Sequence, residues 1–242
     1  VFLGDNKKMS PFDKNSIYGM YNRTENYQSD CSYISQIKAF KDNVSIKSCL
    51  SYTFSVSNSQ GTSLIKDRPF TAEMTRSIML LKEKHYRPRM ADYRIGVFFT
   101  GREQLGEGAK TTAPVYYANR WDIQPSDTAA YLRGEKVKPT KQIVFYIDNT
   151  FPEKWKPYLR EGVTQWNKLF EQIGFKDVVA AKDFPTDDPE FDPDNIKYSC
   201  VRYAPSSIEN AMGPSWVDPR SGEILNASVY SVSYTHLRAH ET

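Results

Sequence analysis

The expected fold of the second half of the chain follows from the sequence Gln142-Ile143-Val144-Phe145-Tyr146-Ile147-Asp148. It is apolar almost without a break, which predicts a strand buried on both faces of a sheet. A periodic apolar face follows from about residue 157 to 173, and it predicts one helix that covers this sheet with Leu159, Val163, Trp166 and Phe170. A second strand of the same sheet is expected at residues 224–230.

The first half of the chain is rich in sequence patterns typical of β-strands. Residues 44–56 alternate and are rich in β-branched and aromatic residues, which predicts a strand. Further strands are predicted at 93–100 and 115–123, and a strand or short helix at 70–81. The polar first 30 residues favour irregular structure with short strands. The chain is therefore expected to be α+β, with a β-rich N-terminal module before a sheet and helix.

Four regions are expected from these patterns. They are a β-rich module at 1–125, a connector at 126–140, a sheet-and-helix region at 141–230, and a tail at 231–242 with no defined place in the fold. The tail contains an isolated Leu237 and follows an abrupt change of pattern, so it is interpreted as non-native sequence.

Composition narrows the class of protein. The 242 residues are 39% hydrophobic and 25% charged, as in folded proteins. The net charge is only +3 and no basic block stands out, so nucleic acid is not an expected partner. No apolar run is long enough to span a membrane, and no transmembrane segment is expected.

The residues that could hold a metal are few. His236 and His240 are four apart, as in zinc-binding helical pairs, but Leu237 stands where a general base would follow the first histidine. His85 is interpreted as a solvated histidine. The three cysteines, Cys31, Cys49 and Cys200, have no ligand spacing. No catalytic and no metal-binding residue is therefore assigned in this sequence.

Several strings together resemble a known family. They are Pro88-Arg89-Met90-Ala91-Asp92-Tyr93-Arg94-Ile95-Gly96-Val97-Phe98-Phe99, Arg120-Trp121, Ile143-Val144-Phe145-Tyr146-Ile147-Asp148, Glu161-Gly162-Val163-x-x-Trp166-Asn167, Phe170-Glu171-x-x-Gly174-Phe175 and Asp218-Pro219-Arg220-Ser221-Gly222-Glu223-Ile224-Leu225. The sequence up to Tyr230 resembles large bacterial zinc metallopeptidases of the metzincin type. In these, an uncharacterised module precedes the catalytic region.

The resemblance implies a mixed sheet and an active-site helix carrying His-Glu-x-x-His-x-x-Gly-x-x-His after the strand that ends near Tyr230. The chain departs from the family there, so the expected zinc belongs to the full-length parent, and this fragment is expected to bind none and to be inactive. The parent is expected to be an extracytoplasmic enzyme that hydrolyses a peptide or protein substrate.

The same resemblance implies that the edge strand of the sheet pairs with an extended peptide. The candidate substrate-binding residues are those of the last strand, Gly222, Ile224, Asn226 and Ser228. An ordinary internal strand is the other interpretation of this segment. The alternative function is a non-enzymatic, β-rich binding module for a protein or glycan partner.

Overall fold

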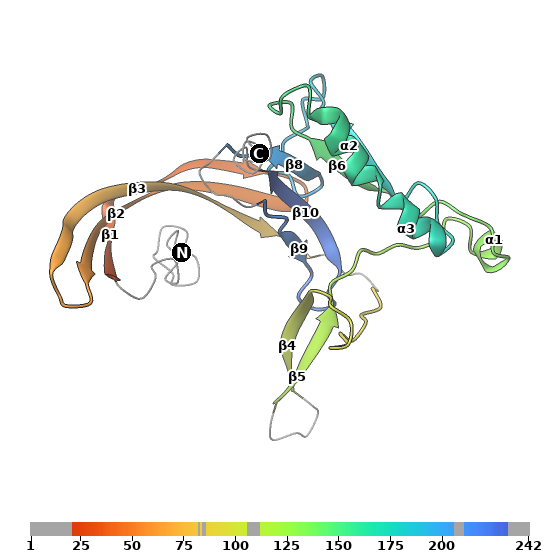
Figure 1. The fold of residues 1–242 in the computed structure, drawn as a ribbon, viewed down its shortest axis with the longest axis horizontal. Helices are drawn as coiled ribbons and strands as arrows, with labels where there is room; N and C mark the ends of the chain where they lie inside the picture. The colour runs from red at the N-terminus through yellow and green to blue at the C-terminus, as the bar shows by residue number, and fades with distance from the viewer. Residues whose placement is uncertain (1–20, 82, 84–85, 106–111, 206–210, 232–242) are drawn as a thin grey trace, which may run out of the picture. The chain divides into compact units, whose positions relative to one another are not determined.

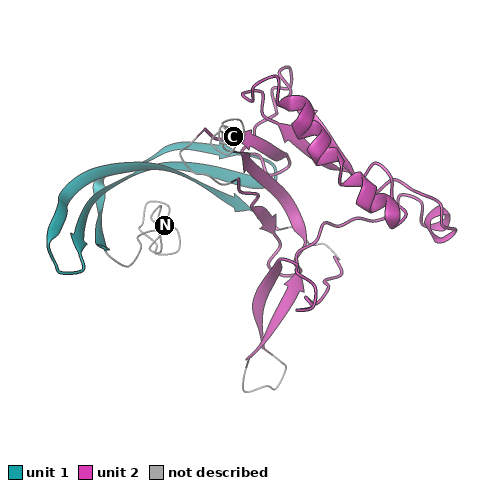
Figure 2. Cartoon of the chain, viewed as in Figure 1, with its two compact units in different colours: residues 1–80 teal, residues 81–242 magenta. Residues whose placement is uncertain are grey.

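The computed structural model describes residues 21–81, 83, 86–105, 112–205 and 211–231 (Figure 1). The chain forms two compact units, Val1–Leu80 and Leu81–Thr242, which are described separately below (Figure 2). Strands make up 51% of the structure and helices 10%, so the chain is β-rich with a small helical part, as expected.

The first unit contains a three-stranded antiparallel sheet. Its strands are β1 (Tyr21–Ala39), β2 (Asn43–Asn58) and β3 (Ser63–Met79), in the order β1-β2-β3. The predicted strand at 44–56 is confirmed as β2, and the segment at 70–81 adopts the strand alternative. The irregular structure expected for the first 30 residues is wrong from Tyr21 onward, because β1 is an edge strand with mostly exposed polar side chains and carries no apolar alternation.

The second unit begins with a hairpin of β4 (Phe99–Leu105) and β5 (Thr112–Ala118). The strand predicted at 93–100 is wrong for most of its length. The Asp92 carboxylate accepts hydrogen bonds from the backbone N–H of Arg94 (3.0 Å) and from its guanidinium, and this local turn competes with strand pairing. The strand predicted at 115–123 ends at Ala118.

A five-stranded mixed sheet follows. Its strands are β6 (Ile143–Ile147), β7 (Val179–Asp183), β8 (Ser199–Tyr203), β9 (Ser215–Val217) and β10 (Ile224–Ser231). They lie in the order β7-β6-β8-β10-β9, and all neighbours are parallel except β9, which is antiparallel to β10. The prediction that residues 142–148 and 224–230 share one sheet is confirmed, with β8 between them.

The helix predicted from about residue 157 to 173 is divided into α2 (Lys156–Thr164) and α3 (Asn167–Gln172), and a short helix α1 (Thr128–Leu132) was not predicted. The Thr164 hydroxyl donates to the Arg160 carbonyl (2.9 Å), a contact that bends helices. Asn167 bonds both backbone groups of Val179 at 2.8 Å and so fixes the start of α3 to β7.

This division changes which residues cover the sheet. α2 packs against β6 and β7, and Leu159, Val163 and Phe170 contact the two buried clusters of the unit. The expected burial of Trp166 is wrong: it lies at the junction of the two helices and is 60% exposed. Gly174 follows α3 in the left-handed conformation typical of a helix C-terminal cap, with φ of 86°.

Of the tail predicted to have no defined place, Ser231 belongs to β10, where it pairs with Tyr203. The remainder, 232–242, lies outside the described residues. In the part of the chain that the structure describes, no helix is both long and apolar enough to cross a bilayer.

Candidate functional site

The strand expected to bind substrate, β10, is not at the edge of the sheet. Ile224 pairs with Val217 of β9, and Ser228 pairs with Cys200 of β8, so β10 has a neighbour on both sides. The edge-strand prediction for Gly222, Ile224, Asn226 and Ser228 is therefore wrong. The main chain of an internal strand is already hydrogen-bonded and cannot accept an added peptide strand.

Two of these residues have structural contacts instead. Asn226 is 2% exposed, and its amide donates to the carbonyls of Ile196 (2.9 Å) and Tyr198 (2.8 Å). Gly222 is buried, and its carbonyl accepts a hydrogen bond from the backbone N–H of Arg120 (3.0 Å). Both residues hold the sheet to neighbouring segments.

The turn between β9 and β10 explains why a glycine stands at 222. Gly222 has φ of +77°, and a Cβ atom there would lie 2.7 Å from the Ala118 carbonyl oxygen and 3.1 Å from the Tyr117 Cβ. The next residues continue the contact, because the Ile224 N–H donates to the Arg120 carbonyl (2.8 Å). The turn therefore docks beside the end of β5 mainly through backbone groups, and the Arg102 guanidinium adds a hydrogen bond to the Arg220 carbonyl (3.2 Å).

An ion pair stabilises the same turn from within. The Asp218 carboxylate accepts hydrogen bonds from the backbone N–H of Arg220 (2.8 Å) and from its guanidinium (2.7 Å to Nη2). These bonds hold the pKa of Asp218 below its ordinary value, although burial opposes them. The Asp218 carbonyl also accepts from the N–H groups of Ser221 and Gly222.

The edge next to β10 belongs to β9, which sequence reasoning missed as a candidate site. Within the described residues, β9 is hydrogen-bonded only on the side of β10. Its central residue, Trp216, is 39% exposed. The sequence Asp218-Pro219-Arg220-Ser221-Gly222-Glu223 is typical of a hairpin turn and so indicates two antiparallel strands here, but it does not indicate which of the two lies at the edge.

The residues described do not assemble a metal centre. His85, His236 and His240 lie outside the described residues. Within the described ranges, no three His, Cys, Asp or Glu side chains come together as metal ligands. Cys200 is buried in β8, and burial raises the pKa of its thiol to about 12, which disfavours the thiolate that binds metals. This donor set does not fit catalytic zinc, which needs three protein ligands.

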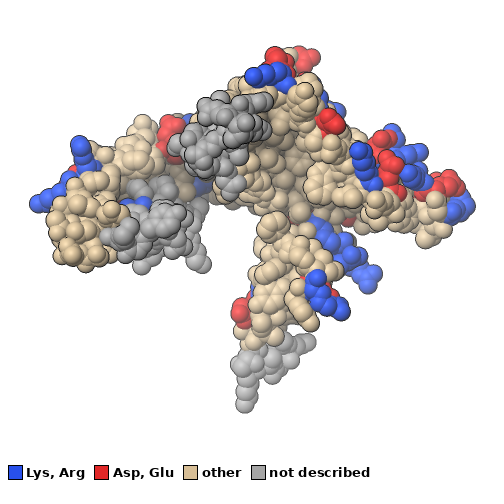
Figure 3. All heavy atoms as spheres, viewed as in Figure 1, with Lys and Arg blue, Asp and Glu red and all other residues tan. Residues whose placement is uncertain are grey.

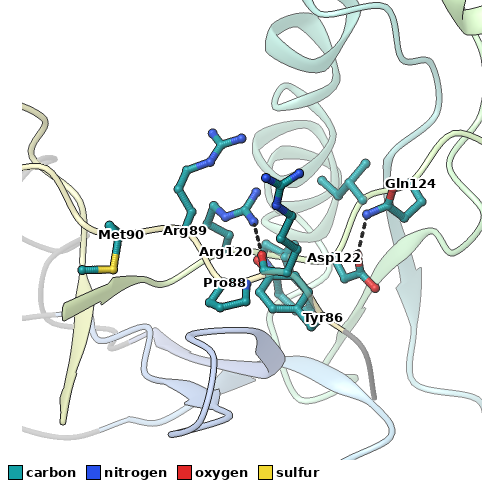
Figure 4. Close-up of a pocket in the computed structure, with 10 residues that line it drawn as sticks. Tyr86, Pro88, Arg89, Met90, Arg120, Asp122 and Gln124 are labelled. Atoms are coloured by element: carbon teal, nitrogen blue, oxygen red, sulfur yellow. Dashed lines mark hydrogen bonds between the residues drawn. The ribbon is translucent and has the colours of Figure 1, made fainter. Parts of the chain in front are cut away.

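A pocket of about 580 Å³ lies between two segments of the second unit (Figure 4). Residues 86–90 form one wall and residues 120–124 the other. Of the ten described residues that line it, three are arginines, Arg87, Arg89 and Arg120, and one, Asp122, is acidic. Figure 3 shows Lys and Arg side chains gathered beside the β4–β5 hairpin, on the face in view.

Contacts within the pocket hold Arg120 in place. Its guanidinium lies over the Tyr86 ring, 5.3 Å from the ring centroid, and its Nη2 donates to the Arg87 carbonyl (3.1 Å). Burial raises the pKa of Tyr86, while the nearby Arg120 charge acts in the opposite direction. On the other wall, the Gln124 amide donates to the Asp122 carboxylate (3.0 Å).

The pocket lies in a part of the chain that matches the sequence model of a known family. Residues 1–126 match a domain of unknown function, DUF5117. The match covers 126 of the 242 residues, so the chain belongs to the DUF5117 family. All ten pocket residues lie inside the matched region. No curated protein and no solved structure matches the chain.

Proposed function

We propose that this chain is the part of a zinc-dependent metallopeptidase of the metzincin type that precedes the zinc-binding helix, with the DUF5117 region before the start of the catalytic domain. One observation carries the proposal. The mixed sheet starts at Ile143, where the family-like strings of the sheet region begin, and its elements follow in the order of a strand, a helical segment and further strands. The resemblance of these strings implies a mixed sheet at this place.

In this proposal the zinc and the general base belong to a helix of the parent protein outside the described residues. Because the described residues do not fit a zinc site, we assign no step of the hydrolysis to them. Their proposed contribution is to position a peptide substrate. The proposal also includes an extracytoplasmic location for the parent.

The strand proposed to bind substrate is β9, in place of β10. A strand at the end of a sheet can pair with an extended peptide through main-chain hydrogen bonds, while neighbouring side chains provide selectivity. The partly exposed Trp216 offers an aromatic contact to one side chain of such a peptide.

The intact parent protein tests this proposal. We expect stoichiometric zinc and cleavage of quenched fluorescent peptides that a zinc chelator abolishes. Trp216→Ala should lower kcat/KM through a higher KM, whereas Trp166→Ala, which alters an exposed tryptophan on the helical segment, should leave both constants unchanged. A purified parent without zinc, or with cleavage that resists chelation, would refute the proposal.

A second candidate function, a binding module for a protein or glycan, is favoured by aromatic exposure near the β4–β5 hairpin. Tyr93 is 98% exposed, Phe98 88% and Phe99 57%, and such side chains are common at recognition surfaces. Saturable binding of a protein or glycan that Phe98→Ser abolishes, in a parent without peptidase activity, would favour this function over the first.

A further inference from the structure

We propose that the pocket between residues 86–90 and 120–124 binds a small molecule that carries an oxyanion, either a carboxylate or a phosphate, on an apolar body. This inference concerns a site inside the DUF5117 region and does not depend on the peptidase proposal. It rests on the charge of the lining, on the arrangement of Arg120 and on the apolar residues beside the arginines.

The charge of the lining is unbalanced. Among the described residues that line the pocket, three arginines and one aspartate leave an excess of two positive charges (three minus one), and the Glu223 carboxylate, whose charge also acts on Tyr86, offsets one of them. In the part of the chain that the structure describes, the guanidinium groups of Arg87 and Arg89 form no ion pair. Elsewhere in the same unit arginines do find carboxylates, as Arg160 does with Asp183. The pocket therefore gathers positive charge that an anionic ligand would neutralise.

The arrangement of Arg120 suits an oxyanion. Its guanidinium is fixed by the Tyr86 ring and by the Arg87 carbonyl, so little side-chain freedom is lost when a ligand binds. Its Nε atom and the Tyr86 hydroxyl are buried, and neither has a hydrogen-bond partner among the described residues. Buried polar atoms without partners are uncommon. A small movement of either side chain toward a bound oxyanion would give its donor an acceptor.

The other residues that line the pocket indicate that the ligand has an apolar part. Pro88, Met90, Trp121 and Ile123 place apolar surface beside the arginines. The volume of about 580 Å³ lies within the range typical of small-molecule pockets. Arginine forks match the geometry of carboxylates and phosphates equally well, so the two sources of the oxyanion must be separated by experiment.

The test uses the full 242-residue chain and isothermal titration calorimetry with benzoate, phenyl phosphate and the neutral analogue benzamide. We expect at least one of the two anions to bind saturably with a Kd at or below about 1 mM, a value at the weak end of specific binding. Benzamide should give no saturable heat. Raising the ionic strength should weaken anion binding, because salt screens exposed charges.

Variants locate the binding. Arg87→Gln and Arg89→Gln should each weaken it about tenfold, since each removes a charge-assisted hydrogen bond. Both side chains are exposed, so the substitutions leave the fold intact. Arg133→Gln is the matched control: it removes one positive charge from an exposed arginine outside the pocket and should change nothing.

The titrations distinguish a phosphate site from a carboxylate site, and both from a pocket that binds no anion. Binding of phenyl phosphate alone identifies a phosphate site, binding of benzoate alone a carboxylate site, and binding of both supports the shared oxyanion chemistry. The proposal is overturned if neither anion binds, if benzamide binds as tightly as the anions, or if the pocket variants bind as well as Arg133→Gln.

Discussion

Replacing Gly222 by alanine tests the docking of the β9–β10 turn directly. Two costs add. The left-handed backbone conformation costs an alanine about 1–2 kcal/mol. The new Cβ would also meet the Ala118 carbonyl oxygen at 2.7 Å, and forcing an extra methyl group into such packing costs about 1–3 kcal/mol. Because the nearest atom belongs to the backbone, it cannot rotate away. The free energy of unfolding should fall by about 2–5 kcal/mol in total.

Gly134→Ala is the matched control. Gly134 has φ of +85°, close to the +77° of Gly222, but a Cβ atom added at Gly134 would have no other atom within 4 Å. This variant should lose only the conformational cost of about 1–2 kcal/mol. Urea unfolding followed by circular dichroism, with linear extrapolation to water, measures both variants. If Gly222→Ala destabilises the protein no more than Gly134→Ala does, the close approach of the turn to Ala118 is not a stabilising contact.

Three further outcomes are expected. Trp166→Ala should lower the free energy of unfolding by only about 1–2 kcal/mol, against about 3–5 kcal/mol for a fully buried aromatic ring, and urea unfolding distinguishes the two. The ion pair with Arg220 lowers the pKa of Asp218 in the folded state. The stability that this pair contributes is therefore complete above the unfolded-state pKa of Asp218, and it is lost as the pH falls through the folded-state pKa. Asp218→Asn should therefore show a flatter loss of stability below about pH 4, and an unchanged acid profile would contradict this. At pH about 8, iodoacetamide should alkylate exposed Cys31 well before buried Cys200, as mass spectrometry of the folded protein would show; equal rates would be inconsistent with the burial of Cys200.

Strands with an apolar pattern could be predicted from the sequence. β2 and β6 have runs of β-branched and aromatic residues, and burial in the sheet interior accounts for both. β1 could not be predicted, because a strand exposed on its surfaces needs no apolar alternation. The division of the helix into α2 and α3 could not be predicted from the sequence either, because it depends on the contact of Asn167 with Val179, twelve residues further along the chain.

The candidate site was harder to predict than the fold. The order of strands in a sheet depends on non-local pairing, so the sequence could not tell that β9 and not β10 lies at the edge. The pocket joins residues 86–90 to 120–124, so Arg120 lies about thirty positions away from Arg87 and Arg89 in the sequence. Its only signal in the sequence was that both segments carry strings of the family resemblance.

Because the β9–β10 turn docks beside the end of β5, the end of the DUF5117 match is not the boundary of a cooperatively unfolding unit. The DUF5117 match ends at residue 126, yet the backbone N–H and carbonyl of Arg120 are both bonded to the turn at 222–224. A protein cut after residue 126 would leave these groups without their partners. The β4–β5 hairpin should therefore lose its protection from hydrogen exchange together with the mixed sheet, so that part of the DUF5117 region unfolds with the region that follows it.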